Sequence, residues 1–271
     1  MSAVEIEPGA TAVPRPTRNL EEGLQNIRDH GLCIVPGVLG GETLRRARDA
    51  LYRAADADRA RGRERKFGLD YAHDDTNQRV WNVLSRDPVF EDLVQHPTAL
   101  AFVRGVLGWP ALLGNISANI TGPGGGEMVL HADQLFVPEP WSAEPQGLNV
   151  SWCLDEFTKA NGATGFAPAS HRLNRPPRAA DAGVDTVAME APAGSIVVFE
   201  SRLWHKTGVN RTRDQRRAGV FAWYTKPIYR TQENWFLSLS PSIRQFASEE
   251  MLVLLGYKTA GLGLVNGASP A

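Results

Sequence analysis

The sequence predicts a mostly β domain with flanking helices, built around a sandwich or double-sheet barrel. From residue 111 onward, seven or eight short apolar segments alternate with loops rich in glycine and proline, which is typical of such folds. Before that point, apolar residues recur at helical spacing instead. The 271 residues are enough for one large domain, and no linker divides them.

The composition is that of an ordinary globular protein and favours no macromolecular partner. Hydrophobic residues make up 42% of the chain, charged residues 22%, and the formal net charge is −1. This balance gives no reason to expect binding to nucleic acid or to a membrane. No apolar run approaches the ~18 residues of a membrane helix, and the N-terminus lacks the pattern of a secretory signal. We therefore expect a cytoplasmic protein.

The first part of the chain is expected to be helical after a disordered start. Residues 1–18 contain three prolines among small and polar residues, which favours disorder. Residues 19–110 are predicted to form the helical part of the single domain that spans residues 19–271. Its expected elements are a helix over 20–30 ended by Gly31, a short strand over 32–39, a long amphipathic helix over 40–66, and two helices split at Pro97.

The second part is expected to form the β core. Residues 111–230 hold the strand-like segments, and residues 231–257 end in a helical stretch. The glycines at 122–126 precede a strand and do not form a G-x-G-x-x-G motif, so a nucleotide-binding loop is not predicted.

A histidine and an aspartate lie one residue apart in the apolar run "VLHADQLF", residues 129–136. In a strand, residues i and i+2 point to the same face, so His131 and Asp133 would project side by side. A third donor, His205, follows the apolar segment "GSIVVFESRLW". Two histidines and one carboxylate form the facial triad of non-haem iron sites, although catalytic zinc sites also use three protein ligands.

The order of several motifs resembles the phytanoyl-CoA dioxygenase family of Fe(II)/2-oxoglutarate-dependent oxygenases. The matching segments are "IRDHGLCIVPGVL", "RVWNVLSRDPVFEDLV", "LGWPALLGNISANI", "LHADQ", "NGATGFAPASHR" and "GSIVVFESRLWHKTGVN". They occur in family order between about residues 24 and 257. The resemblance implies a double-stranded β-helix core of the jelly-roll or cupin-like type, with Fe(II) bound by His131, Asp133 and His205.

The same resemblance implies where 2-oxoglutarate binds. The family places an arginine about eleven residues after the second histidine, where its guanidinium binds the distal carboxylate through paired hydrogen bonds. Here this position is Arg216, with the neighbouring Arg217 as the alternative. Thr164 corresponds to a family position whose hydroxyl helps to hold 2-oxoglutarate. Asn119 is a candidate for the other end of this co-substrate.

Four further residues are candidates for the substrate cavity. His73 lies in a loop that family members often use to cover the substrate, although loop histidines are commonly just solvated. Phe136 and Trp141 follow the ligand segment and would either line the cavity or cap the barrel. Tyr224 would face the same way as Arg216 in an unbroken strand, and core packing is its alternative role.

The resemblance implies an oxygenase that uses Fe(II), 2-oxoglutarate and O₂. Its reaction would be oxidation of a C–H bond, by hydroxylation or by desaturation, cyclisation or epoxidation. The apolar and aromatic content of the loops at 62–80 and 134–147 favours a small to medium, largely hydrophobic substrate, such as a natural-product intermediate. Two alternatives stay open on the residues alone: a Zn or Mn isomerase or hydrolase in a jelly roll, and a barrel that binds a small molecule without catalysis.

Overall fold

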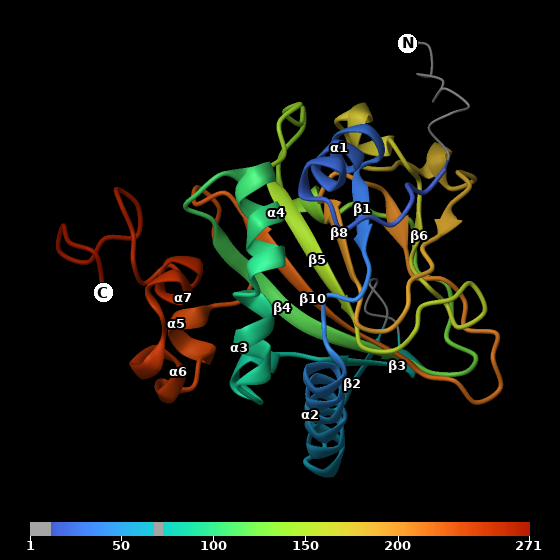
Figure 1. Cartoon of the computed structure of the whole chain (residues 1–271), viewed down its shortest axis with the longest axis horizontal. Coiled ribbons are helices and arrows are strands. Elements are labelled where there is room, and N and C mark those ends of the chain that lie inside the picture. Colours follow the sequence, from blue (N-terminus) through green and yellow to red (C-terminus); the bar gives the residue numbers. More distant parts are fainter. Residues whose placement is uncertain (1–11, 68–72) are drawn as a thin grey trace.

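The computed structural model describes residues 12–67 and 73–271 and shows a large antiparallel sheet with helices against it (Figure 1). The sheet has seven strands in the order β1-β8-β5-β10-β4-β3-β2. Their bounds are β1 Leu32–Val35, β8 Ile196–Glu200, β5 Gly147–Cys153, β10 Arg217–Thr225, β4 Leu112–Thr121, β3 His73–Val80 and β2 Arg65–Phe67. A three-stranded sheet has the order β7-β6-β9, with β7 Val187–Ala188, β6 Gly165–Phe166 and β9 His205–Lys206. The prediction of a mostly β protein with flanking helices is confirmed.

In the described part of the N-terminal half, the α-helices are α1 Leu20–His30, α2 Gly41–Ala60, α3 Val89–Val94 and α4 Pro97–Leu107. Helix α1 begins where the Asn19 side chain accepts a hydrogen bond from the Glu22 amide, and it ends at Gly31, whose φ of 85° is left-handed. Proline at the first position of α4 starts that helix without losing a hydrogen bond. Figure 1 shows α3 and α4 lying across β4, β5 and β10.

Two of the predicted helical regions differ from the structure. The helix predicted over 40–66 ends at Ala60, and Arg65–Phe67 form β2. The C-terminal stretch forms three short helices, α5 Trp235–Ser238, α6 Pro241–Phe246 and α7 Glu249–Leu254. They are separate because Leu239 and Ala247 have extended backbones and Pro241 starts a new helix.

Within residues 12–18, the Thr17 amide donates to the carbonyl of Ile34 and the Arg18 side chain donates to the carbonyl of Pro36. The expectation of disorder for residues 1–11 lies outside the described residues. The short 3-10 helices are η2 Val83–Ser85, η3 Asp133–Phe136, η4 Ser170–Leu173 and η5 Ala179–Asp181.

The two faces of the large sheet have opposite chemistry, and this positions the site. On β10, Tyr224 and the even-numbered residues before it belong to the core that α3 and α4 also contribute to. The other face of β10 carries Arg217, Gly219, Phe221 and Trp223, because side chains alternate along a strand. The matching face of β4 carries Asn115, Ser117, Asn119 and Thr121. On β4 and β10, one face therefore belongs to an apolar core, and the other carries polar groups together with Phe221 and Trp223.

No helix within the described ranges combines the length and the apolar character that crossing a membrane requires.

Candidate metal centre

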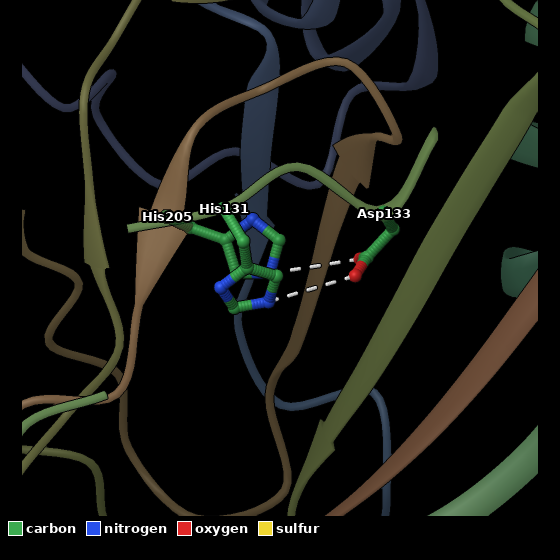
Figure 2. A group of neighbouring side chains, drawn as sticks. All are labelled: His131, Asp133 and His205. Atoms are coloured by element: carbon green, nitrogen blue, oxygen red, sulfur yellow. Dashed lines mark ion pairs between the residues drawn. The ribbon is translucent and has the colours of Figure 1, made fainter. Parts of the chain in front are cut away.

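His131, Asp133 and His205 meet on the polar side of the large sheet (Figure 2). One ligand atom from each lies within 4.8 Å of the other two. The Nε2 atom of His131 is 3.7 Å from one carboxylate oxygen of Asp133, and the Nε2 atom of His205 is 3.5 Å from the other. Among the described residues, no other group of three histidine, cysteine, aspartate or glutamate side chains has such spacing.

A backbone bridge brings the two histidines together. His131 and His205 form an isolated antiparallel pair, in which each amide donates to the other's carbonyl at 3.0 and 2.8 Å. The two residues are therefore directly opposite each other, and their ring centroids are 4.2 Å apart. This one pairing brings together two residues that are 74 positions apart in the sequence.

The aspartate reaches the same point by a route that the sequence did not predict. Residues 129–136 do not form the expected strand, because Asp133 begins the 3-10 helix η3. The backbone of Ala132, between the two ligands, is extended, with φ −130° and ψ 144°. An extended residue at this position turns His131 and Asp133 to the same side. The Ala132 side chain points away and is fully buried beside Trp204.

The hydrogen bonds of both imidazoles leave the correct nitrogen free for a metal. Nδ1 of His131 lies 2.9 Å from the carbonyl of Val129, and Nδ1 of His205 lies 2.9 Å from the carbonyl of Leu203. A carbonyl accepts only, so each Nδ1 carries the proton and each Nε2 presents a lone pair. Such a partner on the second nitrogen is what orients metal-binding histidines.

The protonation state of His131 and the position of Asp133 also suit metal binding. Burial lowers the pKa of His131 to about 4, and the neighbouring His205 contributes in the same direction. The imidazole is therefore neutral near pH 7. Asp133 is held in place by Asn149, whose Nδ2 donates to a carboxylate oxygen at 2.9 Å. Two imidazole nitrogens and one carboxylate oxygen fit Fe(II), and zinc accepts the same donors.

A cavity of about 190 Å³ opens at the three ligands. Its walls are rich in uncharged polar groups, including Asn115, Ser117, Asn119, Asn149, Thr164 and Thr207. Arg79 and the aromatic side chains of Phe199, Phe221 and Trp223 complete much of the lining. A polar pocket beside an open metal site is a suitable place for an oxygen-rich co-substrate.

The structure does not bring Arg216 to this cavity. Arg216 is exposed and lines a surface depression with Arg59 and Glu64. Arg217, the next residue, is 1% exposed and lies on the polar face of the sheet. Its Nη2 donates to the Thr121 hydroxyl at 2.9 Å, and its guanidinium lies 4.6 Å from the ring centroid of Phe157.

Burial lowers the pKa of Arg217 to about 10, because the charged form loses its hydration. Among the described residues, Arg217 has no ion-pair partner. A buried cation without a carboxylate is costly unless something supplies the missing charge.

Three other predicted residues do line the cavity. Thr164 is buried, with 9% exposure, and Asn119 is buried beside Thr121 on β4. The Nδ2 of Asn119 donates to the same Thr121 hydroxyl that Arg217 contacts. Phe136 lies at the end of η3 and is 74% exposed over the cavity.

The remaining predicted residues lie elsewhere. Trp141 is buried behind the ligand loop, packs with Ala132 and Trp204, and donates from Nε1 to the carbonyl of Val137. Tyr224 faces the helical core, where its hydroxyl donates to the carbonyl of Val94. The backbone of His73 begins β3, while its side chain lies outside the described residues.

Two contributors to the cavity, Asn149 and Arg79, were missed by the sequence reasoning. Both carry a signal that was available: Asn149 is a polar residue inside the fully buried strand "GLNVSWC". Arg79 ends a run of polar residues on β3. A polar residue at every second position of a buried strand indicates a face that points into a site.

Comparison with known proteins identifies the family. The sequence profile described as "Phytanoyl-CoA dioxygenase (PhyH)" matches residues 27–218. "Dioxygenase af480" of Aspergillus fumigatus is 36% identical over 265 residues, which cover 94% of this chain and 85% of that protein.

Two solved structures share the fold. The non-heme alpha ketoglutarate dependent carbocyclase SnoK from nogalamycin biosynthesis has a TM-score of 0.67 at 21% identity, covering 84% of this chain and 95% of its own. The epimerase SnoN, in complex with Fe3+, alpha ketoglutarate and nogalamycin RO, has a TM-score of 0.63 at 21% identity, covering 82% and 90%. The predicted jelly-roll, cupin-like core is thereby confirmed.

The family profile covers well over half of the chain, and a dioxygenase more than one third identical covers nearly all of it. The chain therefore belongs to the phytanoyl-CoA dioxygenase family of Fe(II)/2-oxoglutarate-dependent oxygenases.

Proposed function

We propose that this oxygenase oxidises a C–H bond of a small to medium-sized, largely hydrophobic molecule, such as a natural-product intermediate. Hydroxylation is the expected outcome, and desaturation, cyclisation and epoxidation are variants of the same chemistry. The observation that carries the proposal is the convergence of His131, Asp133 and His205, with both Nε2 atoms turned to one point beside a cavity.

The three residues would hold the metal on one side and leave adjacent positions open toward the cavity. Bound there, Fe(II) and 2-oxoglutarate activate O₂ for cleavage of a substrate C–H bond, with succinate and CO₂ as the other products. The protein contributes orientation. Asn149 fixes the carboxylate of Asp133, and the carbonyls of Val129 and Leu203 fix the two imidazoles.

Arg217, in preference to Arg216, is proposed to bind the distal carboxylate of 2-oxoglutarate. Arg217 is a buried guanidinium without an ion-pair partner, on the sheet face that carries the cavity. A carboxylate supplied by the co-substrate would satisfy it with charge-assisted hydrogen bonds. Arg216 lies on the opposite face in solvent, where a carboxylate gains little.

Thr164, Asn119 and Arg79 are proposed to help hold the same co-substrate. All three line the metal cavity, and the Oδ1 atom of Asn119 is buried there without a partner among the described residues. Arg79 adds a second positive charge beside the ligands, which also contributes to the low pKa of His131. Two guanidiniums outweigh the single carboxylate of Asp133, and this net positive charge favours an anionic ligand.

Two comparisons support a small-molecule substrate. SnoN is described in complex with nogalamycin RO, and SnoK belongs to nogalamycin biosynthesis. A fold shared with these two enzymes is compatible with a substrate of that kind.

The proposal is tested by adding Fe(II) and 2-oxoglutarate without oxygen and recording the visible charge-transfer band. Wild-type protein should show the band, and succinate should form with O₂ when a substrate is present. Asp133→Ala should lose the band or shift it and should form no substrate-dependent succinate. Unchanged turnover in Asp133→Ala would remove Asp133 from the ligand set.

A further inference from the structure

A second cavity adjoins the metal cavity and is lined by Asp133 but by neither of the two histidines. Its volume is about 240 Å³, against about 190 Å³ for the metal cavity. Asp133, Phe136, Trp223 and Gln232 line both, so the two are neighbouring compartments of one site. We name the second one the outer compartment; its other walls include Val137, Gly147, Thr225 and Tyr229.

The outer compartment differs from the metal cavity in chemistry. Among its described lining residues, only two carry a charge: Asp133, which the metal site uses, and Arg230, which is exposed at the edge. The remainder are uncharged, and the rings of Phe136, Trp223 and Tyr229 supply much of the surface. A negatively charged group moved into such a space would lose hydration and would lie near Asp133, with only the exposed Arg230 as an opposite charge. An apolar group would lose unfavourable contact with water.

The walls are held in place before any ligand arrives. Nε1 of Trp223 donates to the hydroxyl of Ser201 at 2.9 Å, and the hydroxyl of Tyr229 donates to the side chain of Gln146 at 3.1 Å. Each ring is therefore fixed at its polar end and presents its apolar surface to the compartment. Walls that are ordered in advance reduce the entropy that a ligand loses on binding.

Phe136 lies at the junction of the two compartments. Its side chain is 74% exposed, although a large aromatic ring is normally buried. Leu135, the preceding residue in the same 3-10 turn, is 51% exposed and lines neither compartment. The exposed ring of Phe136 thus has a place to pack only if a ligand fills the space beneath it.

We propose that the outer compartment holds an uncharged, apolar ring or chain of the substrate, beyond the carbon that is oxidised. Phe136 and Tyr229 determine specificity by packing on this group. The substrate is therefore bipartite: its reacting end lies in the polar metal cavity, and its uncharged apolar part extends past Phe136. This inference rests on the proposed function for the position of the reacting end.

The test uses 2-naphthol as an uncharged apolar probe and 2-naphthalenesulfonate as a probe with the same rings and a permanent negative charge. Binding is measured by ligand-observed NMR titration on the protein loaded with Fe(II) and 2-oxoglutarate without oxygen. The variants are Phe136→Ala, which removes the shared wall, and Val137→Phe, which reduces the space. Leu135→Ala is the matched control, because it deletes an exposed apolar side chain from the same turn.

The expected result is that 2-naphthol binds wild-type protein about ten-fold more tightly than the sulfonate does. Phe136→Ala and Val137→Phe should each weaken 2-naphthol binding by about ten-fold, and Leu135→Ala should leave it within about two-fold. Equal binding in all variants, tighter binding of the sulfonate, or no binding of 2-naphthol by wild-type protein would overturn the proposal.

The charge-transfer band of the same samples separates this inference from the proposed function. If the protein shows the band but does not bind 2-naphthol, the result supports the oxygenase site and contradicts the role of the outer compartment. If it binds 2-naphthol with the expected variant pattern but shows no band, the result supports the outer compartment and contradicts the assigned metal site.

Discussion

At the scale of single residues, the choice between two adjacent arginines follows from strand parity. A shift of one residue moves a side chain from one face of a sheet to the other. Counting eleven residues from His205 reaches Arg216, but the backbone of β10 turns Arg217 toward the polar face and leaves Arg216 in solvent. Spacing along the sequence located the arginine pair, and only the alternation of β10 distinguishes its members.

Substitution of each arginine measures this distinction. Arg217→Ala should raise the Kd for 2-oxoglutarate about 30-fold or more, because a buried charge-assisted interaction is lost. Arg216→Ala should change it less than about two-fold, since an exposed charge contributes little. Titration of the charge-transfer band with 2-oxoglutarate gives both constants. A larger rise of the Kd in Arg216→Ala than in Arg217→Ala would mean that Arg216 binds 2-oxoglutarate.

Asn149 provides a second test at this scale. Its Nδ2 donates to Asp133, so Asn149→Ala should weaken Fe(II) affinity about 10- to 100-fold. Asn115→Ala is the matched control, because Asn115 lines the same cavity but donates to Gln232 instead. Competition with a chelator reports the affinities. Equal losses in the two variants would mean that Asn149 does not position the carboxylate.

At the scale of elements, the site depends on pairings that local sequence patterns did not reveal. The run around His131 was predicted as a strand, yet it forms one bridge to His205 followed by a 3-10 turn. Of its apolar residues, Ala132 is buried and packs against Trp204, whereas Val129, Leu135 and Phe136 are exposed. The turn could not be predicted because the Gln134 amide donates to the carbonyl of Ser201, a residue far away in the sequence.

Tyr224 tests the division of the large sheet into two faces. Its hydroxyl donates to the carbonyl of Val94 inside the helical core. Tyr224→Phe should lower the free energy of unfolding by about 1–2 kcal/mol, because a buried carbonyl loses its partner. The Kd for 2-oxoglutarate should stay unchanged. Denaturant unfolding and the titration described above measure the two quantities. Weaker binding of 2-oxoglutarate with an unchanged free energy of unfolding would place Tyr224 near the metal.

At the scale of the whole molecule, the sequence predicted the order of elements better than their ends. The helices and the β core lie where the motifs indicated, and the three candidate metal ligands lie close together. The long helix was predicted to continue to residue 66 because its basic residues are compatible with a helix, but Arg65–Phe67 pair with β3. Trp141 was expected to line the cavity or cap the barrel because it follows the ligand segment in the sequence. Its packing partners come from three separate segments.

Stability of the whole domain should depend on pH through a histidine outside the metal site. His171 links η4 to α1, since its Nε2 donates to the carbonyl of Arg28. Burial lowers the pKa of His171 to about 4, and the positive charges of Arg202 and Arg172 contribute in the same direction.

An unfolded histidine titrates near pH 6.5, so the unfolded chain binds a proton that the folded one does not. The contribution of His171 is therefore complete above about pH 6.5 and is lost as the pH falls toward 4. At most it amounts to about 3 kcal/mol. In the metal-free protein, His171→Gln should reduce the slope of the free energy of unfolding against pH between pH 6.5 and 4. A slope identical to that of wild-type protein would contradict this assignment.

The central claim is that one metal ion joins His131, Asp133 and His205, with the co-substrate carboxylate on Arg217. A crystal structure of the anaerobic protein with Fe(II) and 2-oxoglutarate, with anomalous data at the iron edge, tests it most directly. The prediction is a single iron peak bound by the Nε2 atoms of both histidines and a carboxylate oxygen of Asp133, with 2-oxoglutarate extending to the Arg217 guanidinium. An iron peak away from these three side chains, or a co-substrate that leaves Arg217 without a partner, would contradict it.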